Sequence, residues 1–243
     1  MTFEGKNALI TGGTRGIGRA VALKLAAEGA RVTCWYHSNA ESARETEALS
    51  PNITTAAVDV TQHDAVKSAL RGLTENGRPV DVLVHAAGIT RDTLLAGMED
   101  DQWHAVLDAN LTGAYHVCRE VVREMIFQRS GRIVNLASLS GVTGLPGQTN
   151  YAASKGGLIA FTKALALETA RYGLLVNAVS PGLIQTEISH SLSEERLQQM
   201  TAQIPLGRAG TPEEVAELIL FLVSPRNTYI TGQNLIISGG LTT

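Results

Sequence analysis

Short apolar runs alternate with longer helical patterns along the whole chain, and this alternation constrains the fold more than any other feature. Most of the runs are apolar at consecutive positions, as strands buried on both faces are. Strands that alternate with helices form parallel sheets, because the chain must cross over between parallel neighbours. We expect seven strands, at residues 7–11, 31–36, 54–60, 81–87, 132–138, 174–180 and 234–238.

The helical patterns lie between these strands, at residues 17–28, 39–49, 62–76, 99–128, 150–171 and 212–223. The last begins with Thr-Pro-Glu-Glu at 211–214, a sequence typical of a helix start. No linker or repeat interrupts the alternation, so residues 1–243 are expected to form one doubly wound α/β domain. The least regular segment, 181–210, follows a strand end, where such folds bind ligands. It is either a mobile loop over a site, with a lid near 187–205, or a surface excursion.

Composition excludes several classes of protein. The formal net charge is −3, which gives no support for a nucleic-acid binder. The only two cysteines, Cys34 and Cys118, lie in apolar settings and favour a reducing compartment without disulfides. Residues 1–11 do not resemble a secretory signal, and the apolar run 218–223 is too short to span a bilayer. The histidines lack partners at metal-ligand spacing, so we expect no metal site. The cysteines, the first residues and the short apolar run together predict a cytoplasmic protein with no membrane contact.

A glycine-rich turn joins the first strand to the first helix. Gly12, Gly16 and Gly18 are spaced G-x-x-x-G-x-G. Glycines permit a tight turn and let a pyrophosphate approach the backbone, and the following helix N-terminus attracts the anion. Glycines also simply end strands, but this position between strand and helix favours a dinucleotide site.

The end of the second strand indicates which dinucleotide. An acidic residue there would bind the ribose 2′-hydroxyl of NAD, but this chain has Trp-Tyr-His-Ser at 35–38. Arg15, in the glycine turn, could meet a 2′-phosphate, with His37 or Ser38 as a second contact. We therefore expect NADP(H) as the cofactor; the alternative is that Arg15 is only a solvated turn residue.

The ends of the third and fourth strands add further candidates. Asp59 could accept a hydrogen bond from an adenine amino group, although a strand-end cap is the simpler interpretation. Ala86, Ala87 and Gly88 are small enough for a cofactor to lie against their backbone. His85 precedes them and is expected to be a hydrogen-bonded strand-end histidine.

The segment NYAASKGGLIAFTKAL places Tyr151 and Lys155 four residues apart, on one face of a helix. Ser138 ends the fifth strand and Asn110 lies in the helix after the fourth. Both strand ends fall on the same sheet edge as the glycine turn. The simpler alternative is a helical tyrosine beside a lysine that reaches solvent.

The motifs TGGTRGIG, HAAG, DANLTG, NLAS, YAASK and SPGLIQT occur in an order and spacing that resemble the short-chain dehydrogenase/reductase family over essentially the whole chain. The segments FEGK, AAGITRD, GRIVNLAS, GLIAFTKALA and YITGQ are most similar to 3-oxoacyl-acyl-carrier-protein reductases. The resemblance implies a single-domain Rossmann fold with a seven-stranded parallel sheet. It also implies a catalytic tetrad of Asn110, Ser138, Tyr151 and Lys155.

The expected cofactor-binding residues come from the strand ends and from a segment that the resemblance assigns to the nicotinamide carboxamide. They are Gly12, Thr14, Arg15, Gly16, Ile17, Gly18, His37, Asp59, Val60, Ala86, Ala87, Gly88, Asn110, Tyr151, Lys155, Pro181, Gly182, Ile184 and Thr186. One departure concerns His85, where the family usually has an asparagine that bridges neighbouring strands. A histidine can replace that bridge in part.

The expected chemistry is reduction of a ketone. A phenol has a pKa near 10, and a nearby ammonium is expected to lower it toward neutrality. Ser138 would then hydrogen-bond the substrate carbonyl, and Asn110 would hold a water that passes protons to Lys155. Hydride transfer belongs to the nicotinamide.

The resemblance implies a 3-oxoacyl thioester as substrate, on an acyl carrier protein in a fatty-acid or polyketide/polyene route. Arg129 and Arg171 are candidate carrier contacts near the site mouth. Relatives are mostly tetramers, so a homotetramer is expected. Alternatives are an acetoacetyl-CoA reductase or a sugar or cyclic-alcohol dehydrogenase; a regulator that binds the cofactor without turnover would not need Ser138, Tyr151 and Lys155.

Overall fold

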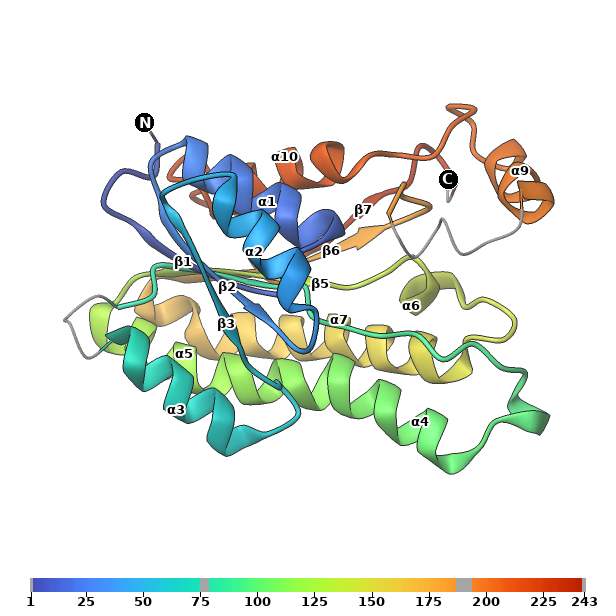
Figure 1. Ribbon diagram of the computed structural model, residues 1–243, viewed down its shortest axis with the longest axis horizontal. Coiled ribbons are helices and arrows are strands. Elements are labelled where there is room, and N and C mark those ends of the chain that lie inside the picture. Colours follow the sequence, from blue (N-terminus) through green and yellow to red (C-terminus); the bar gives the residue numbers. More distant parts are fainter. Residues whose placement is uncertain (1, 75–78, 187–193, 242–243) are drawn as a thin grey trace.

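The computed structural model describes residues 2–74, 79–186 and 194–241. Their strands are β1 Asn7–Thr11, β2 Arg31–Tyr36, β3 Ile53–Ala57, β4 Val82–His85, β5 Gly131–Leu136, β6 Leu174–Pro181 and β7 Asn234–Ile237. They form one parallel sheet in the order β3-β2-β1-β4-β5-β6-β7 (Figure 1). The order reverses at the β1–β4 pair, which is where doubly wound sheets bind ligands. The predicted fold class is therefore confirmed.

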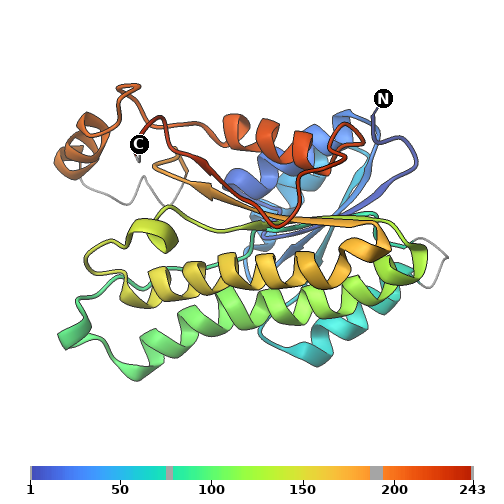
Figure 2. The ribbon, with the colours of Figure 1, turned by 180° about the vertical axis from the view of Figure 1, so that it is seen from behind.

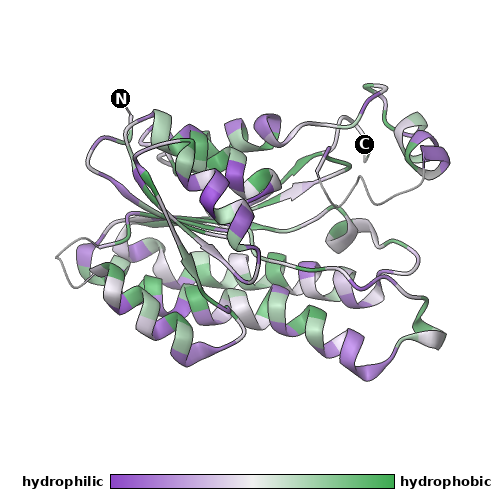
Figure 3. Ribbon diagram, viewed as in Figure 1, coloured by the Kyte–Doolittle hydropathy of each residue, from purple (hydrophilic) through white to green (hydrophobic). Residues whose placement is uncertain are grey.

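The helices form two layers around this sheet (Figures 1 and 2). One face carries α1 Gly16–Ala27, α2 Ala40–Ala48 and α10 Pro212–Val223, and the other carries α3 His63–Thr74, α4 Asp100–Leu107, α5 Gly113–Gln128 and α7 Thr149–Thr169. The apolar helix faces turn toward the sheet, and the polar faces turn outward (Figure 3). A separate hydrophobic cluster fills each side of the sheet.

Three predicted strands end two or three residues earlier than expected, and a fourth, β7, ends one residue earlier. Residues 58–60, 86–87 and 137–138 leave the sheet after β3, β4 and β5, respectively. These residues line a cleft instead of continuing the strand ladder. An apolar run cannot reveal this boundary, because residues in the ladder and residues facing a ligand cleft are both small or β-branched.

The predicted helix 99–128 is interrupted. A π-helical turn, η2 Asp108–Thr112, separates α4 from α5. Gly113 then begins α5 close to the segment after β3, since a Cβ at Gly113 would lie only 2.7 Å from Val60 Cγ2. Such turns often occur at functional sites, and this one carries Asn110.

Two helices lie where sequence analysis expected irregular structure. The short α6 Ser140–Thr143 follows β5, and α9 Glu194–Ala202 lies within the predicted lid. Residues 187–193 of that lid fall outside the described part of the chain. The predicted helix start at 211 is confirmed, because Thr211 Oγ1 accepts from Glu214 N at 3.3 Å and Glu214 Oε2 accepts from Thr211 N at 2.8 Å.

Two further features of the described residues concern the expected environment. Cys34 and Cys118 are both buried free thiols. Among the described helices, none combines the length and apolar character that crossing a membrane requires.

The glycine turn should be intolerant of even one methyl group. A Cβ at Gly18 would lie 2.1 Å from the carbonyl oxygen of Gly12, so Gly18→Ala must push backbone apart. We expect it to lower the free energy of unfolding by about 1–3 kcal/mol. The matched control is Gly72→Ala in α3, where nothing lies within 4 Å and where alanine favours the helix by about 0.5–1 kcal/mol. Urea denaturation midpoints should move in opposite directions; equal midpoints would contradict the close approach.

Candidate active site

A cleft of about 1510 Å³ lies along the carboxyl ends of β1 to β6. Every predicted cofactor-binding residue lines it except Asn110, which is buried behind its wall. Residues of α9 and of the segment after β5 border the same cleft at its other end, among them Ser140, Leu145, Gln148, Met200 and Gln203. The cleft is therefore large enough for a dinucleotide and a second, smaller molecule.

The glycine turn forms a cradle that a side chain would fill. Gly12 has a φ of +64°, and a Cβ there would lie 2.9 Å from the amide nitrogen of Ala87. Gly12 N also donates to Trp35 O at 2.8 Å, which ties the turn to the end of β2. The turn is thus held between two strand ends, with the N-terminus of α1 directed at the cleft, as an anionic pyrophosphate requires.

Three side chains from α1 and α2 hold the glycine turn by hydrogen bonds to one backbone carbonyl. The carbonyl oxygen of Thr14 accepts hydrogen bonds from Arg19 Nε at 2.8 Å, Ser42 Oγ at 2.9 Å and Thr46 Oγ1 at 3.1 Å. These three donors come from α1 and α2, and none of them was predicted from the sequence. They fix the turn without using the amide groups that face the cleft.

The end of β2 and the glycine turn present positive and neutral groups. Arg15 is exposed, lines the cleft and uses its side chain for no helix-capping bond. His37 is also exposed, and its Nε2 lies 3.6 Å from Asp59 Oδ2. The predicted contact of Arg15 with a 2′-phosphate, with His37 or Ser38 as a second contact, is thus compatible with the geometry.

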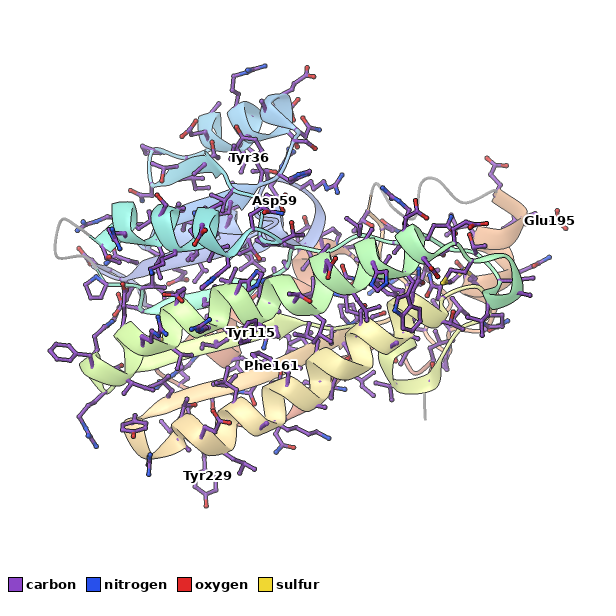
Figure 4. All side chains as sticks on the ribbon, turned by 90° about the horizontal axis from the view of Figure 1, so that it is seen from below. Tyr36, Asp59, Tyr115, Phe161, Glu195 and Tyr229 are labelled. Carbon is purple, nitrogen blue, oxygen red and sulfur yellow. The ribbon has the colours of Figure 1, made fainter. Side chains whose placement is uncertain are left out.

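Asp59 follows β3, close to Tyr36 at the end of the neighbouring β2 (Figure 4). Its Oδ1 accepts from the Thr61 amide at 2.9 Å and the Thr61 hydroxyl at 2.8 Å. This is the strand-end cap that sequence analysis considered as the alternative. The cap occupies one carboxylate oxygen, and the predicted contact with adenine stays a prediction.

The wall opposite the glycine turn depends on Thr11 and His85. Thr11 Oγ1 lies 2.9 Å from His85 Nδ1 and accepts from Ala87 N at 3.2 Å. Burial, together with the charge of Lys155, lowers the pKa of His85 to about 3, so the ring is neutral. Its Nε2 has no hydrogen-bond partner among the described residues. His85 thus makes one bond to the neighbouring strand, the partial replacement for asparagine that was expected.

Asn110 holds the loop after β4. Its Oδ1 accepts from Ile89 N at 2.8 Å, and its Nδ2 donates to Ile89 O at 3.0 Å and Ser154 Oγ at 3.0 Å. Both amide protons are used, so the side chain has none left to donate to a water on the way to Lys155. The predicted water-holding role stays a prediction, and the observed bonds join the loop after β4, η2 and α7.

Lys155 and Tyr151 lie on the first turns of α7, as predicted. Lys155 Nζ donates to the carbonyl oxygen of Leu136 at 2.7 Å and lies 5.7 Å from the centre of the Tyr151 ring. Burial lowers the pKa of Lys155 to about 8. Gly88 borders the same space, because a Cβ there would lie 3.4 Å from Nζ.

The net shift of the Tyr151 pKa is upward, where sequence analysis expected Lys155 to lower it. Burial raises the pKa of Tyr151; the Ser138 hydroxyl opposes this by hydrogen bonding, and the Asp92 carboxylate reinforces it. The physical reason is that a buried phenolate loses hydration, while the Lys155 ammonium is directed at a backbone carbonyl. Tyr151 is consequently a neutral phenol at physiological pH and can donate its proton to a nearby oxygen.

The segment after β6 closes one end of the cleft. Pro181 is the last residue of β6, Gly182 N donates to Ile237 O at 2.9 Å, and Ile184 forms a bridge with Gly210. A Cβ at Gly182 would lie 3.0 Å from Ser238, which explains the glycine. Thr186 lines the cleft near α9. In the described ranges no group of three or more histidine, cysteine or acidic side chains could hold a metal ion.

The two candidate carrier contacts lie elsewhere. Arg129 caps α5 and Arg171 follows α7, and the Arg129 guanidinium donates to the Arg171 carbonyl at 3.3 Å. The 21 residues of α7 span about 30 Å, which separates this pair from Tyr151 at the other end. The expectation that these arginines flank the mouth of their own cleft is wrong. Arg91, which sequence analysis did not single out, is an exposed cation on the cleft lining.

The buried ammonium of Lys155 should reduce the stability of the protein. Below pH 8 the lysine is charged in both the folded and the unfolded state, so the full desolvation cost is present. Between pH 8 and its unfolded value of about 10.4, the unfolded state binds more protons and stability rises with pH. We expect Lys155→Met to unfold at higher urea than the natural protein at pH 7, with a smaller difference at pH 9.5. A difference that is constant or grows would contradict the buried charge.

Comparisons with known proteins agree with this site. A family model described as Enoyl-(Acyl carrier protein) reductase matches residues 12–242. The chain is 46% identical over 244 residues to the 3-oxoacyl-acyl-carrier-protein reductase FabG of Thermotoga maritima, and 42% identical over 241 residues to that of Vibrio harveyi. Each alignment covers 99% of both chains. With the cleft, the glycine turn and the Ser138–Tyr151–Lys155 group in place, the chain belongs to the short-chain dehydrogenase/reductase family.

Proposed function

We propose that this protein reduces the ketone of a 3-oxoacyl thioester to the 3-hydroxyacyl thioester with NADPH. The observation that carries the proposal is the pair of neighbouring hydroxyl groups on Ser138 and Tyr151 in the cleft, beside the buried Lys155. Two hydroxyl donors suit a carbonyl oxygen, which accepts hydrogen bonds, better than they suit a carbon–carbon double bond. The relatives named as 3-oxoacyl-acyl-carrier-protein reductases support the choice of substrate.

Each residue has a separate role in the proposed ketone reduction. When bound, the nicotinamide supplies the hydride that adds to the substrate carbonyl carbon. Tyr151, kept protonated by burial, gives its proton to the carbonyl oxygen, and Ser138 donates a hydrogen bond that stabilises negative charge as it develops there. Lys155, held by the Leu136 carbonyl, places a positive charge beneath the phenol and stabilises it once the proton has left.

The choice of NADPH over NADH rests on the adenosine end of the cleft. Arg15 is exposed on the lining, and residues 35–39 offer no carboxylate that would repel a 2′-phosphate. His37 can add a second contact, although Asp59 lies 3.6 Å from its ring. Among the described residues, no hydrogen-bond or ion-pair partner is found for the Arg15 side chain, which suits an added phosphate.

An acyl carrier protein is the proposed bearer of the substrate. Arg129 and Arg171 could reach a cleft mouth only if a second copy brought its own pair there, since they lie at the opposite sheet edge of their own chain. The homotetramer therefore stays a prediction on which this carrier contact depends. A cytoplasmic location stays a prediction as well.

The reaction itself is tested by loss of NADPH absorbance. We expect fast turnover of a 3-oxoacyl-carrier-protein, slower turnover of acetoacetyl-CoA, and a loss of at least about 100-fold in kcat for Tyr151→Phe, which removes the acid but keeps the ring. Turnover of the CoA ester alone would favour the acetoacetyl-CoA alternative. Binding of NADPH without turnover of either thioester would contradict the proposal and direct the search to sugars and cyclic alcohols.

Cofactor preference is tested with Arg15→Ala. Loss of one charge-assisted hydrogen bond, worth about 1.5–3 kcal/mol, should raise the KM for NADPH by about 10- to 100-fold and leave the KM for NADH unchanged. Arg71→Ala is the control, because Arg71 is an exposed arginine of α3 away from the cleft lining. An Arg15→Ala protein with its full preference for NADPH would show that the discriminating contact lies elsewhere.

A further inference from the structure

A chain of hydrogen bonds runs along the substrate end of the cleft and ends at Ser138. Asp92 Oδ2 accepts from Gln148 Nε2 at 2.7 Å, and Gln148 Oε1 accepts from Ser140 Oγ at 2.8 Å. The Ser140 amide then donates to Ser138 Oγ at 3.2 Å. Asp92, Gln148, Ser140 and Ser138 all line the cleft. We call this series the Asp92–Ser138 chain.

We propose that Asp92 and Gln148 are positioning residues that orient the Ser138 hydroxyl toward the substrate oxygen. They act through Ser140 and do not take part in the chemistry themselves. The inference rests on the proposed function, because it assigns the use of Ser138 as a donor to the substrate carbonyl.

The hydrogen bonds of Ser138 Oγ explain how the Ser138 hydroxyl is oriented. The Ser140 amide proton occupies one lone pair of Ser138 Oγ, so the hydroxyl proton of Ser138 must point elsewhere. The same hydroxyl lies close enough to the phenol of Tyr151 to lower the pKa of that phenol. A carbonyl oxygen that meets both hydroxyl groups must therefore lie between them, in the cleft.

The amide group of Gln148 is what allows it to bond to both of its neighbours. Gln148 donates to a carboxylate with one end of its amide and accepts from a hydroxyl with the other. Glutamate cannot donate when ionised and would face Asp92 with like charge, and an aliphatic residue can do neither. Only an amide side chain of this length satisfies both neighbours at once.

The backbone supports the same placement. Thr93 N donates to Gly147 O at 2.8 Å, and Asn150 Nδ2 donates to Arg91 O at 3.1 Å. One main-chain bond and one side-chain bond thus join the loop after β4 to the loop before α7 and to the first turn of α7, on either side of the Asp92–Gln148 pair. These bonds should keep the loops together when the pair is altered, so that a variant reports on orientation and not on unfolding.

The first test needs no enzyme activity. Gln148→Leu should speed hydrogen exchange in peptides from residues 139–148, since Ser140 loses its partner, and should leave exchange in α7 beyond residue 155 unchanged. Gln233→Leu is the control, because within the described residues the Gln233 side chain bonds only to the Thr231 carbonyl near β7, far from Ser138. Unchanged exchange in residues 139–148 would overturn the proposal whatever the substrate is.

The second test is a double-mutant cycle on the 3-oxoacyl thioester. Gln148→Leu should lower kcat by about 10- to 100-fold with the NADPH dissociation constant unchanged, because a small misplacement of a donor costs that much. In a Ser138→Ala background the same substitution should cost less than about 2-fold, since it acts through Ser138. Asp92→Asn, which keeps an acceptor for Gln148, should retain most of the activity that Asp92→Leu loses.

The outcomes separate this inference from the proposed function. An equal loss in both backgrounds would show that Gln148 acts independently of Ser138 and would overturn the inference. Absence of thioester turnover in the natural protein would refute the proposed function, and the exchange experiment would still decide whether the Asp92–Ser138 chain orders its loop.

Discussion

The reversal of strand order between β1 and β4 is the constraint on which the rest of the structure depends. At that point the carboxyl ends of two neighbouring strands turn apart, and the cleft lies between them. The two turns that begin there are nonetheless in close contact, since Gly12 packs on the amide of Ala87 and Thr11 bonds to both His85 and Ala87. One wall of the cleft is therefore backbone, held by a single buried hydroxyl.

Burial governs the electrostatics of the titratable groups at this site. The pKa of Lys155 falls to about 8, that of His85 falls to about 3, and that of Tyr151 rises, each chiefly because the charged form loses hydration. All three groups are thereby driven toward neutrality. A neutral phenol suits an acid that must carry its proton until a carbonyl oxygen arrives, and the partly charged lysine beneath it becomes most valuable after the proton has gone.

Polar side chains that bond to one another and to the backbone carry much of the architecture of this site. Asn110 ties the loop after β4 to α7 through Ile89 and Ser154, and Thr14 gathers three donors behind the glycine turn. The Asp92–Ser138 chain does the same at the substrate end. Each removes conformational freedom from a loop whose other face borders the cleft.

The fold was largely predictable from local patterns. The bounds of β1 and β2 agree with the predicted ranges, because their apolar runs end at glycine or polar residues, and the start of α10 follows from its capping residues. The shared face of Tyr151 and Lys155 was also predictable, since helical spacing alone puts them there. The break at η2 was not predictable, because the pattern of residues 99–128 is that of one helix. The bond between Asn110 and Ile89 forms only in the folded chain.

The sequence by itself determined which elements form, in what order, and which side chains reach the carboxyl edge of the sheet, because each follows from spacing along the chain. Tertiary structure alone decided the sign of the Tyr151 pKa shift and the place of Arg129 and Arg171 at the far end of α7. It also decided the partners of Ser138, Asn110 and His85. Desolvation and hydrogen bonding depend on residues distant in sequence, and only the folded chain brings these residues together.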